Sequence, residues 1–117
     1  MQATVAINRA EVRRYLTRIG DRWRLDGAYL GGRALKGEPK DHDDFWPGFT
    51  VVLVSDAFDG IPWLERVYAA TAIWDRHEMG SAADVYCYTR AEFERKRDST
   101  PAVREATWHG LDLLVFV

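Results

Sequence analysis

The sequence predicts a small α/β domain in which helices pack on a mixed β-sheet. Three apolar segments indicate strands, over residues 28–30, 49–54 and 83–88. A stretch over 111–117 ends the chain as a last strand or as an apolar tail that docks on the domain. Capping residues and helical periodicity mark the intervening segments, and such an alternation is typical of a sheet covered by helices.

The first helix is expected over residues 8–20. Its apolar residues fall at i, i+3, i+4 and i+7 and form one face: Val12, Tyr15, Leu16 and Ile19. Asn8 with Glu11 has the spacing of a capping box, and Gly20 suits the C-terminal end. The arginines of the segment are then expected to face solvent: Arg13, Arg14 and Arg18.

The strongest strand signal follows a polar loop. Residues 28–30 form a short buried strand that ends at Gly31-Gly32, and residues 33–48 are rich in turn-forming residues. The run over 49–54 is apolar at nearly every position, which predicts a strand buried on both faces.

A second long helix is expected to begin near Asp59-Gly60-Ile61-Pro62, because proline is tolerated in a first turn. Its expected buried stripe consists of Trp63, Leu64, Val67 and Tyr68, with Thr71 and Trp74 as further candidates. Gly80 ends this region.

Two shorter helices follow the third strand. Thr89 and Glu92 form a second capping box, which opens one of them. Thr100-Pro101 opens the other, and Gly110 ends it.

Length and composition fit one domain over residues 1–117, with 47% hydrophobic and 29% charged residues. The formal charge of −2 argues against a bulk nucleic-acid ligand, which usually needs a basic face. Cys87 is the only cysteine, so no internal disulfide can form. Because we find neither a secretory segment nor an apolar run of about 18–20 residues, we expect a cytoplasmic chain without a membrane span. Five Trp, five Tyr and five Phe favour burial against a protein partner or in a homodimer.

Five segments between residues 28 and 114 follow one another in a telling order. They are Leu30-Gly31-Gly32-Arg33-Ala34, the strand 51–56, the helix start 58–66, the strand and turn 83–93, and the segment 103–106 with Gly110. Together they resemble the minimal nucleotidyltransferases of the DNA-polymerase-β type. In that family the same order holds a Gly-Ser turn, the strand after an Asp-x-Asp motif, a helix start, the strand of a third acid and a closing helix. The resemblance implies the nucleotidyltransferase fold.

The resemblance also implies a chemistry for the matching positions. The family's helix N-terminus after the Gly-Ser turn holds a nucleoside triphosphate through backbone N–H groups. Gly31 and Gly32 match that turn, and Arg33 beside them could bind phosphate or cover the strand with its stem. The Asp-x-Asp pair and the third acid bind Mg²⁺ ions that stabilise the attacking and leaving oxygens. Asp84 matches the third acid, which implies a catalytic and metal-binding role.

The sequence departs from the family at two motifs. Gly32 replaces the Ser of the turn, which removes a hydroxyl group and keeps the backbone N–H. An alignment without gaps puts Gly48 and Thr50 at the two Asp-x-Asp positions, and one remaining carboxylate cannot hold two hard cations. Asp41 and Asp43 have the same spacing in the preceding loop and are the alternative catalytic and metal ligands. The other interpretation is a solvent-exposed turn.

Three functions remain open from the sequence. The first is a nucleotidyltransferase-like domain with lost or weakened catalysis that serves as a nucleotide- or partner-binding module, and the missing Asp-x-Asp favours it. The second is an active Mg²⁺-dependent nucleotidyltransferase that uses Asp84 with Asp41 and Asp43. The third is an antitoxin-like interaction protein that pairs with a helical partner, as stand-alone members of the family do in toxin–antitoxin modules. An exposed apolar patch of residues such as Trp46, Trp63, Trp74 or Trp108 would favour it.

Other reactive or aromatic residues have structural interpretations. Cys87 is expected to be a buried small hydrophobe, and the three histidines lack metal-ligand spacing. Phe45-Trp46 either stacks a base or packs back on the sheet.

Overall fold

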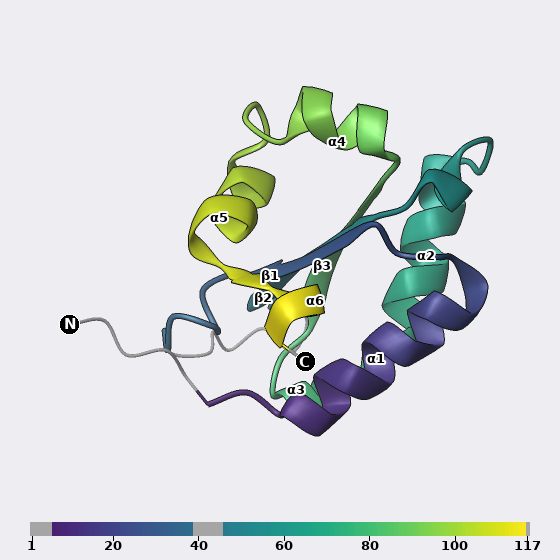
Figure 1. Ribbon diagram of the computed structural model, residues 1–117. Coiled ribbons are helices and arrows are strands. Elements are labelled where there is room, and N and C mark those ends of the chain that lie inside the picture. Colours follow the sequence, from purple (N-terminus) through teal and green to yellow (C-terminus); the bar gives the residue numbers. More distant parts are fainter. Residues whose placement is uncertain (1–5, 39–45, 117) are drawn as a thin grey trace.

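A computed structural model of the protein describes residues 6–38 and 46–116 (Figure 1). The helices and strands, in chain order, are α1 (Arg9–Arg22), β1 (Gly27–Gly31), β2 (Phe49–Val54), the 3-10 helix η1 (Asp56–Phe58), α2 (Trp63–Ile73), α3 (Arg76–Met79), β3 (Ala83–Tyr88), α4 (Arg90–Lys96), α5 (Pro101–His109), β4 (Leu111–Asp112) and α6 (Leu113–Phe116). The four strands form one sheet in the order β3-β2-β1-β4. β2 and β3 run parallel and the other pairs run antiparallel, so the predicted mixed α/β class is confirmed.

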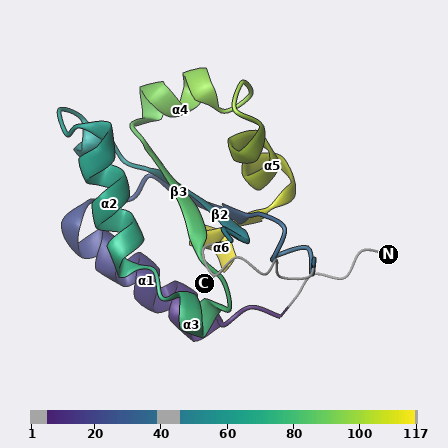
Figure 2. The ribbon, with the colours of Figure 1, turned by 180° about the vertical axis from the view of Figure 1, so that it is seen from behind.

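The central strand β2 is buried on both faces, as predicted. Val51 and Leu53 pack in one hydrophobic cluster with residues of α1, while Val52 and Val54 pack in a second cluster with residues of α4 and α5. This follows from the alternation of side chains along a strand. We call the two sides the α1 face and the α5 face. Figures 1 and 2 show α1 and α2 on one side of the sheet and α4 and α5 on the other.

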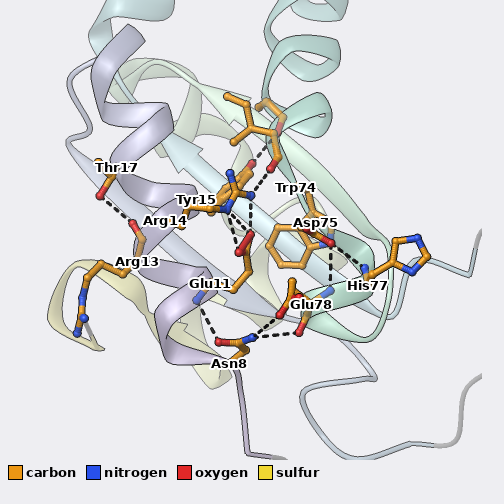
Figure 3. A network of polar contacts seen from close by, with 12 residues as sticks. Asn8, Glu11, Arg13, Arg14, Tyr15, Thr17, Trp74, Asp75, His77 and Glu78 are labelled. Atoms are coloured by element: carbon orange, nitrogen blue, oxygen red, sulfur yellow. Dashed lines mark hydrogen bonds and ion pairs between the residues drawn. The ribbon is translucent and has the colours of Figure 1, made fainter.

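Polar contacts fasten α1 to α2 and α3 (Figure 3). The buried Tyr15 hydroxyl donates to the Ala70 carbonyl at 2.9 Å, and the Arg14 guanidinium donates to the Ile73 carbonyl at 2.6 Å. The Asn8 amide donates to the Glu78 carboxylate at 3.1 Å. Two of these bonds tie α1 to main-chain carbonyls of α2, and the third ties the start of α1 to α3.

The predicted first helix is confirmed, with two differences. Asn8 caps it by accepting from the Glu11 N–H, but Gly20 does not end it and the helix continues to Arg22. An isolated glycine costs a helix about 1 kcal/mol, and here the packing of Ile19 and Trp23 on the core outweighs that cost. Arg14 is not a free solvent-facing residue either, because it binds the Glu11 carboxylate and the main chain of residue 73.

The predicted buried stripe of the second long helix is only partly right: Val67 and Trp74 pack against the core, but three other members are exposed. Trp63, Leu64 and Tyr68 are 40%, 58% and 69% exposed, whereas Arg66 and Ala70 are buried. The Arg66 guanidinium donates to the carbonyls of Ile61 and Cys87 and to the Glu92 carboxylate, so its charge is paired inside the fold. That pairing turns a charged residue toward the core and the aromatic residues of the helix toward its outer side.

The C-terminal segment is only partly a strand. Leu111 and Asp112 pair with β1, and α6 then turns the buried Leu113 into the core of the α1 face. The second capping box is confirmed, because Thr89 and Glu92 bond each other's main chain at the start of α4. Within the described ranges, no helix is long and apolar enough to cross a membrane.

Candidate functional site

Two adjoining pockets open beside the turn that follows β1, on the α5 face. One, of about 370 Å³, is lined by Gly31, Gly32, Leu35, Lys36, Glu105, His109 and Gly110. The other, of about 200 Å³, shares three of these residues and extends to Arg33 and Thr50. The three residues predicted to bind a cofactor, Gly31, Gly32 and Arg33, therefore line one connected depression.

The backbone of the turn requires glycine at both positions. A Cβ at Gly31 would lie 2.8 Å from the Ala106 Cα, which shows how closely α5 crosses the strand. Gly32 has a φ of 105°, and a Cβ there would lie 2.4 Å from the Gly48 carbonyl oxygen. A serine side chain does not fit this conformation, so the departure from the Gly-Ser turn is built into the packing.

No helix begins directly after this turn. Residues 33–37 form consecutive turns, in which the N–H groups of Lys36 and Glu38 donate to the Arg33 carbonyl. The helix N-terminus that the resemblance implies is therefore not present in the described chain at this point. A phosphate bound here would be held by side-chain charge and single N–H groups rather than by a helix end.

Charged side chains rim the depression. Lys36 and Glu105 form an ion pair, and the Lys36 ammonium lowers the pKa of the Glu105 carboxyl group. The Arg33 guanidinium lies 5.0 Å from the centre of the Trp46 ring and is exposed. Because Lys36 is matched by a carboxylate, Arg33 is the residue best placed to attract an anion.

Trp46 itself packs inward. It is 5% exposed and lies under Arg33, so of the two interpretations of Phe45-Trp46 the structural one is confirmed for Trp46. Phe45 lies outside the described residues.

Asp84 lies on β3 and projects to the same face of the sheet as Thr50. In the parallel register of β2 and β3 it is opposite Thr50, and paired residues of neighbouring strands project to the same face. Asp84 is exposed, and partial burial raises the pKa of its carboxyl group. The alignment of Thr50 with one Asp-x-Asp position thus has a spatial counterpart: a threonine occupies the place beside Asp84.

At Gly48, the residue aligned with the other Asp-x-Asp position, neighbouring side chains leave no space for a side chain. A Cβ at Gly48 would lie 2.5 Å from the Ser81 Oγ and 2.8 Å from the Trp46 ring. Ser81 Oγ in turn accepts from the Gly48 N–H and donates to the Trp46 carbonyl. An aspartate at residue 48 would therefore have to displace a buried, hydrogen-bonded serine.

The alternative metal ligands Asp41 and Asp43 lie outside the described residues, as does His42. Among the residues that the structure does describe, no three His, Cys, Asp or Glu side chains gather as a metal site. Cys87 is buried as expected, and burial raises the pKa of its thiol to about 12.

A third pocket lies away from the residues that the sequence predicted as a site. It lies at the outer edge of β3, has a volume of about 370 Å³ and is lined by Trp63, Tyr86, Tyr88, Glu92, Arg95, Lys96 and Thr100. Tyr86 and Tyr88 alternate with the inward-facing Val85 and Cys87, so the period of two in this strand was an available signal. No such signal was available for Trp63, because helical periodicity predicted that this residue lies in the core.

Comparison with known proteins adds no family. Neither a protein-family model nor a curated protein matches the chain.

Proposed function

We propose that this protein is a nucleotidyltransferase-like domain with lost or weakened catalysis, which serves as a nucleotide- or partner-binding module. One observation carries the proposal. In the register of β2 and β3, Thr50 lies opposite Asp84, where a metal-binding pair would need a second carboxylate. A lone exposed carboxylate with a raised pKa is a poor ligand for Mg²⁺, which prefers several oxygens around it.

Nucleotide binding is supported by the pockets at the Gly31–Gly32 turn. Their glycines line the pockets with main-chain atoms and no side chain, as at many phosphate sites. Arg33 supplies a positive charge at the rim of the smaller pocket, and a guanidinium group suits phosphate oxygens. We infer that the phosphates of a nucleoside triphosphate bind here.

The test is calorimetric titration of ATP with and without Mg²⁺. We expect binding that persists without Mg²⁺, that is unchanged in Asp84→Ala, and that weakens about tenfold in Arg33→Gln, as loss of one charged contact of about 1.4 kcal/mol requires. A loss of about tenfold in Asp84→Ala would instead establish a metal-dependent site and favour the active enzyme with Asp41 and Asp43. If ATP binds in neither condition, partner binding is the remaining candidate function.

A gain-of-function variant sharpens this test. Thr50→Asp places a second carboxylate beside Asp84, on a neighbouring strand about 4.8 Å away. We expect Mg²⁺ affinity to rise in Thr50→Asp and to return to the wild-type level in the double variant Thr50→Asp, Asp84→Asn. Thr50→Asn is the control for the change in shape.

Partner binding is the second candidate, and the outer side of α2 favours it. Trp63, Leu64 and Tyr68 are exposed there, and large apolar side chains on one helix surface mark interaction sites. Trp108 on α5 is also exposed, whereas Trp46 is buried and Trp74 half-buried, so only part of the expected tryptophan patch reaches the surface. Sedimentation of the protein alone would show whether a second copy covers α2, because Tyr68→Asp should then convert dimer to monomer.

A further inference from the structure

The third pocket, at the edge of β3, differs in chemistry from the glycine turn. Its wall is aromatic: the ring centres of Trp63 and Tyr88 lie 5.2 Å apart, and those of Tyr86 and Tyr88 lie 6.3 Å apart with nearly parallel planes. Tyr88 is buried and also packs on Phe93 at 6.5 Å, which holds it from behind. Trp63 and Tyr86 keep exposed ring surface on either side of it.

The charges around this wall are unbalanced. The one carboxylate of the lining, Glu92, accepts from the Arg66 guanidinium at 2.6 Å and from the Thr89 N–H at 2.8 Å. The negative charge of Glu92 is therefore neutralised by Arg66, which lies on the core side of the pocket. Arg95 and Lys96, at the end of α4, are exposed and form no ion pair with any described residue.

The phenol groups do not add negative charge. Burial raises the pKa of Tyr86 and that of Tyr88, so both rings are neutral near neutral pH. The pocket thus combines an uncharged aromatic wall with two cations at its rim. Its volume of about 370 Å³ lies within the range of small-molecule sites, about 300–1,000 Å³.

We propose that the pocket formed by Trp63, Tyr86, Tyr88, Arg95 and Lys96 binds a nucleoside monophosphate. The base stacks on the exposed ring surface of Trp63 and Tyr86, and Arg95 and Lys96 bind the phosphate. Stacking on aromatic side chains tolerates any base, because every base has a π-face. The Lys96 ammonium and the Arg95 guanidinium beside the aromatic wall favour a base that carries a phosphate on its sugar.

This inference goes beyond the proposed function, because it depends neither on the Gly31–Gly32 turn nor on Mg²⁺. The two sites lie on the same face of the sheet and are lined by different residues. A variant of one site therefore leaves the other intact, and the two proposals fail separately.

The experiment is titration of AMP into the full chain in the presence of EDTA, followed by tryptophan fluorescence and calorimetry. We expect saturable binding that quenches Trp63 emission and weakens as salt is raised, because the cations are exposed. Adenosine, which lacks the phosphate, and ribose 5-phosphate, which lacks the base, should each bind more weakly than AMP. Equal binding of ribose 5-phosphate and AMP would overturn the stacking role of the rings.

Matched variants locate the site. Trp63→Ala should weaken AMP binding about fivefold or more, the low end of the range for loss of one base–aromatic stack. Tyr68→Ala, an exposed aromatic residue on the same helix that does not line the pocket, should have no effect.

The double variant Arg95→Gln, Lys96→Gln keeps every ring and should weaken AMP but not adenosine. Its control is Arg13→Gln, Arg18→Gln, which removes the same charge from exposed residues of α1. The double variant also guards against misfolding, because both residues are exposed. The proposal fails if wild type does not bind AMP, or if AMP binds equally to Trp63→Ala and wild type. Arg33→Gln should leave AMP binding unchanged, and a loss there would assign the ligand to the glycine turn instead.

Discussion

On the α1 face, α1 and α2 close over seventeen buried residues of one cluster, whereas on the α5 face α4 and α5 share a cluster of six among the described residues. The α1 face is also closed by polar bonds, in which side chains of α1 reach the main chain of α2 (Figure 3). The two pockets at the Gly31–Gly32 turn and the aromatic pocket at β3 lie on the α5 face or at its edge. The α1 face therefore holds the larger buried cluster, while the sites proposed above lie on the other face. Pockets are not confined to that face, because one of about 460 Å³ is lined by Arg14 and Arg18 of α1 and Ile73 of α2.

The variant with the largest expected effect tests whether the backbone on the α5 face can adjust to an added side chain. Gly32→Ser forces a side chain against the Gly48 carbonyl and a φ of 105° on a residue with a Cβ. Backbone strain of about 1–3 kcal/mol and overpacking of similar size should together cost about 3 kcal/mol of unfolding free energy. Urea denaturation measures that cost.

The control for Gly32→Ser is Gly60→Ala. Gly60 has a similar φ of 81°, but nothing lies within 4 Å of a Cβ built there. It should cost only about 1 kcal/mol, the strain without the clash. Equal losses in the two variants would mean that the turn yields, and that a Gly-Ser turn could form in this chain after all.

A second prediction compares the two faces directly within β2. Val51 and Val52 are adjacent and fully buried, and they project to the α1 face and the α5 face respectively. Removal of two methyl groups costs about 1.6 kcal/mol in transfer free energy, and a cavity that cannot collapse adds to this. Val51→Ala should therefore cost about 2–3 kcal/mol, and Val52→Ala nearer 1.5 kcal/mol, because the smaller cluster can relax toward the pockets.

Thermal and urea unfolding of the two alanine variants under identical conditions would check this. If Val52→Ala is as costly as Val51→Ala, the α5 face is as rigid as the other and the expected difference between the faces is wrong.

The sequence predicted the sheet better than the surfaces. The strands over 49–54 and 83–88 and the helix caps at Asn8 and Thr89 were predicted from local patterns, because apolar runs and capping residues act on their own neighbours. The side of α2 that faces the core was not predicted, since it depends on the hydrogen bonds of Arg66 with Ile61, Cys87 and Glu92. Two of those partners lie 21 and 26 residues further along the chain, and helical periodicity carries no information about them.

The sequence predicts candidate site residues, whose binding role stays a prediction, but not how they lie in space. The positions Gly31, Gly32, Arg33 and Asp84 were identified along the chain, and the structure places all four on the side of the pockets or the α5 face. The aromatic pocket at β3 was missed, because its residues come from α2, β3 and α4, and only the fold brings them together.

The smallest expected effect concerns Asp84 and the pH dependence of stability. Burial raises the pKa of this carboxyl group above its ordinary value of 3.8, so folding disfavours its charged form. Below pH 3.8 the group is protonated in both states and contributes nothing. As the pH rises through the ordinary and then the raised pKa, ionisation lowers the free energy of unfolding, and the loss is complete above the raised value.

Asp84→Asn removes this titration. The variant should match wild type near pH 3.5 and exceed it by a few tenths of a kcal/mol at pH 7, the range for an exposed position. Urea unfolding at several pH values between 3.5 and 7.5 measures the difference, with Asp59→Asn, at the end of η1, as a control on another exposed acid. A variant less stable than wild type at pH 7 would mean that the Asp84 carboxylate has a favourable partner in solution. Repeating the titration with Mg²⁺ would then test one such partner: a stabilisation of wild type that Asp84→Asn lacks would show that a metal binds at Asp84.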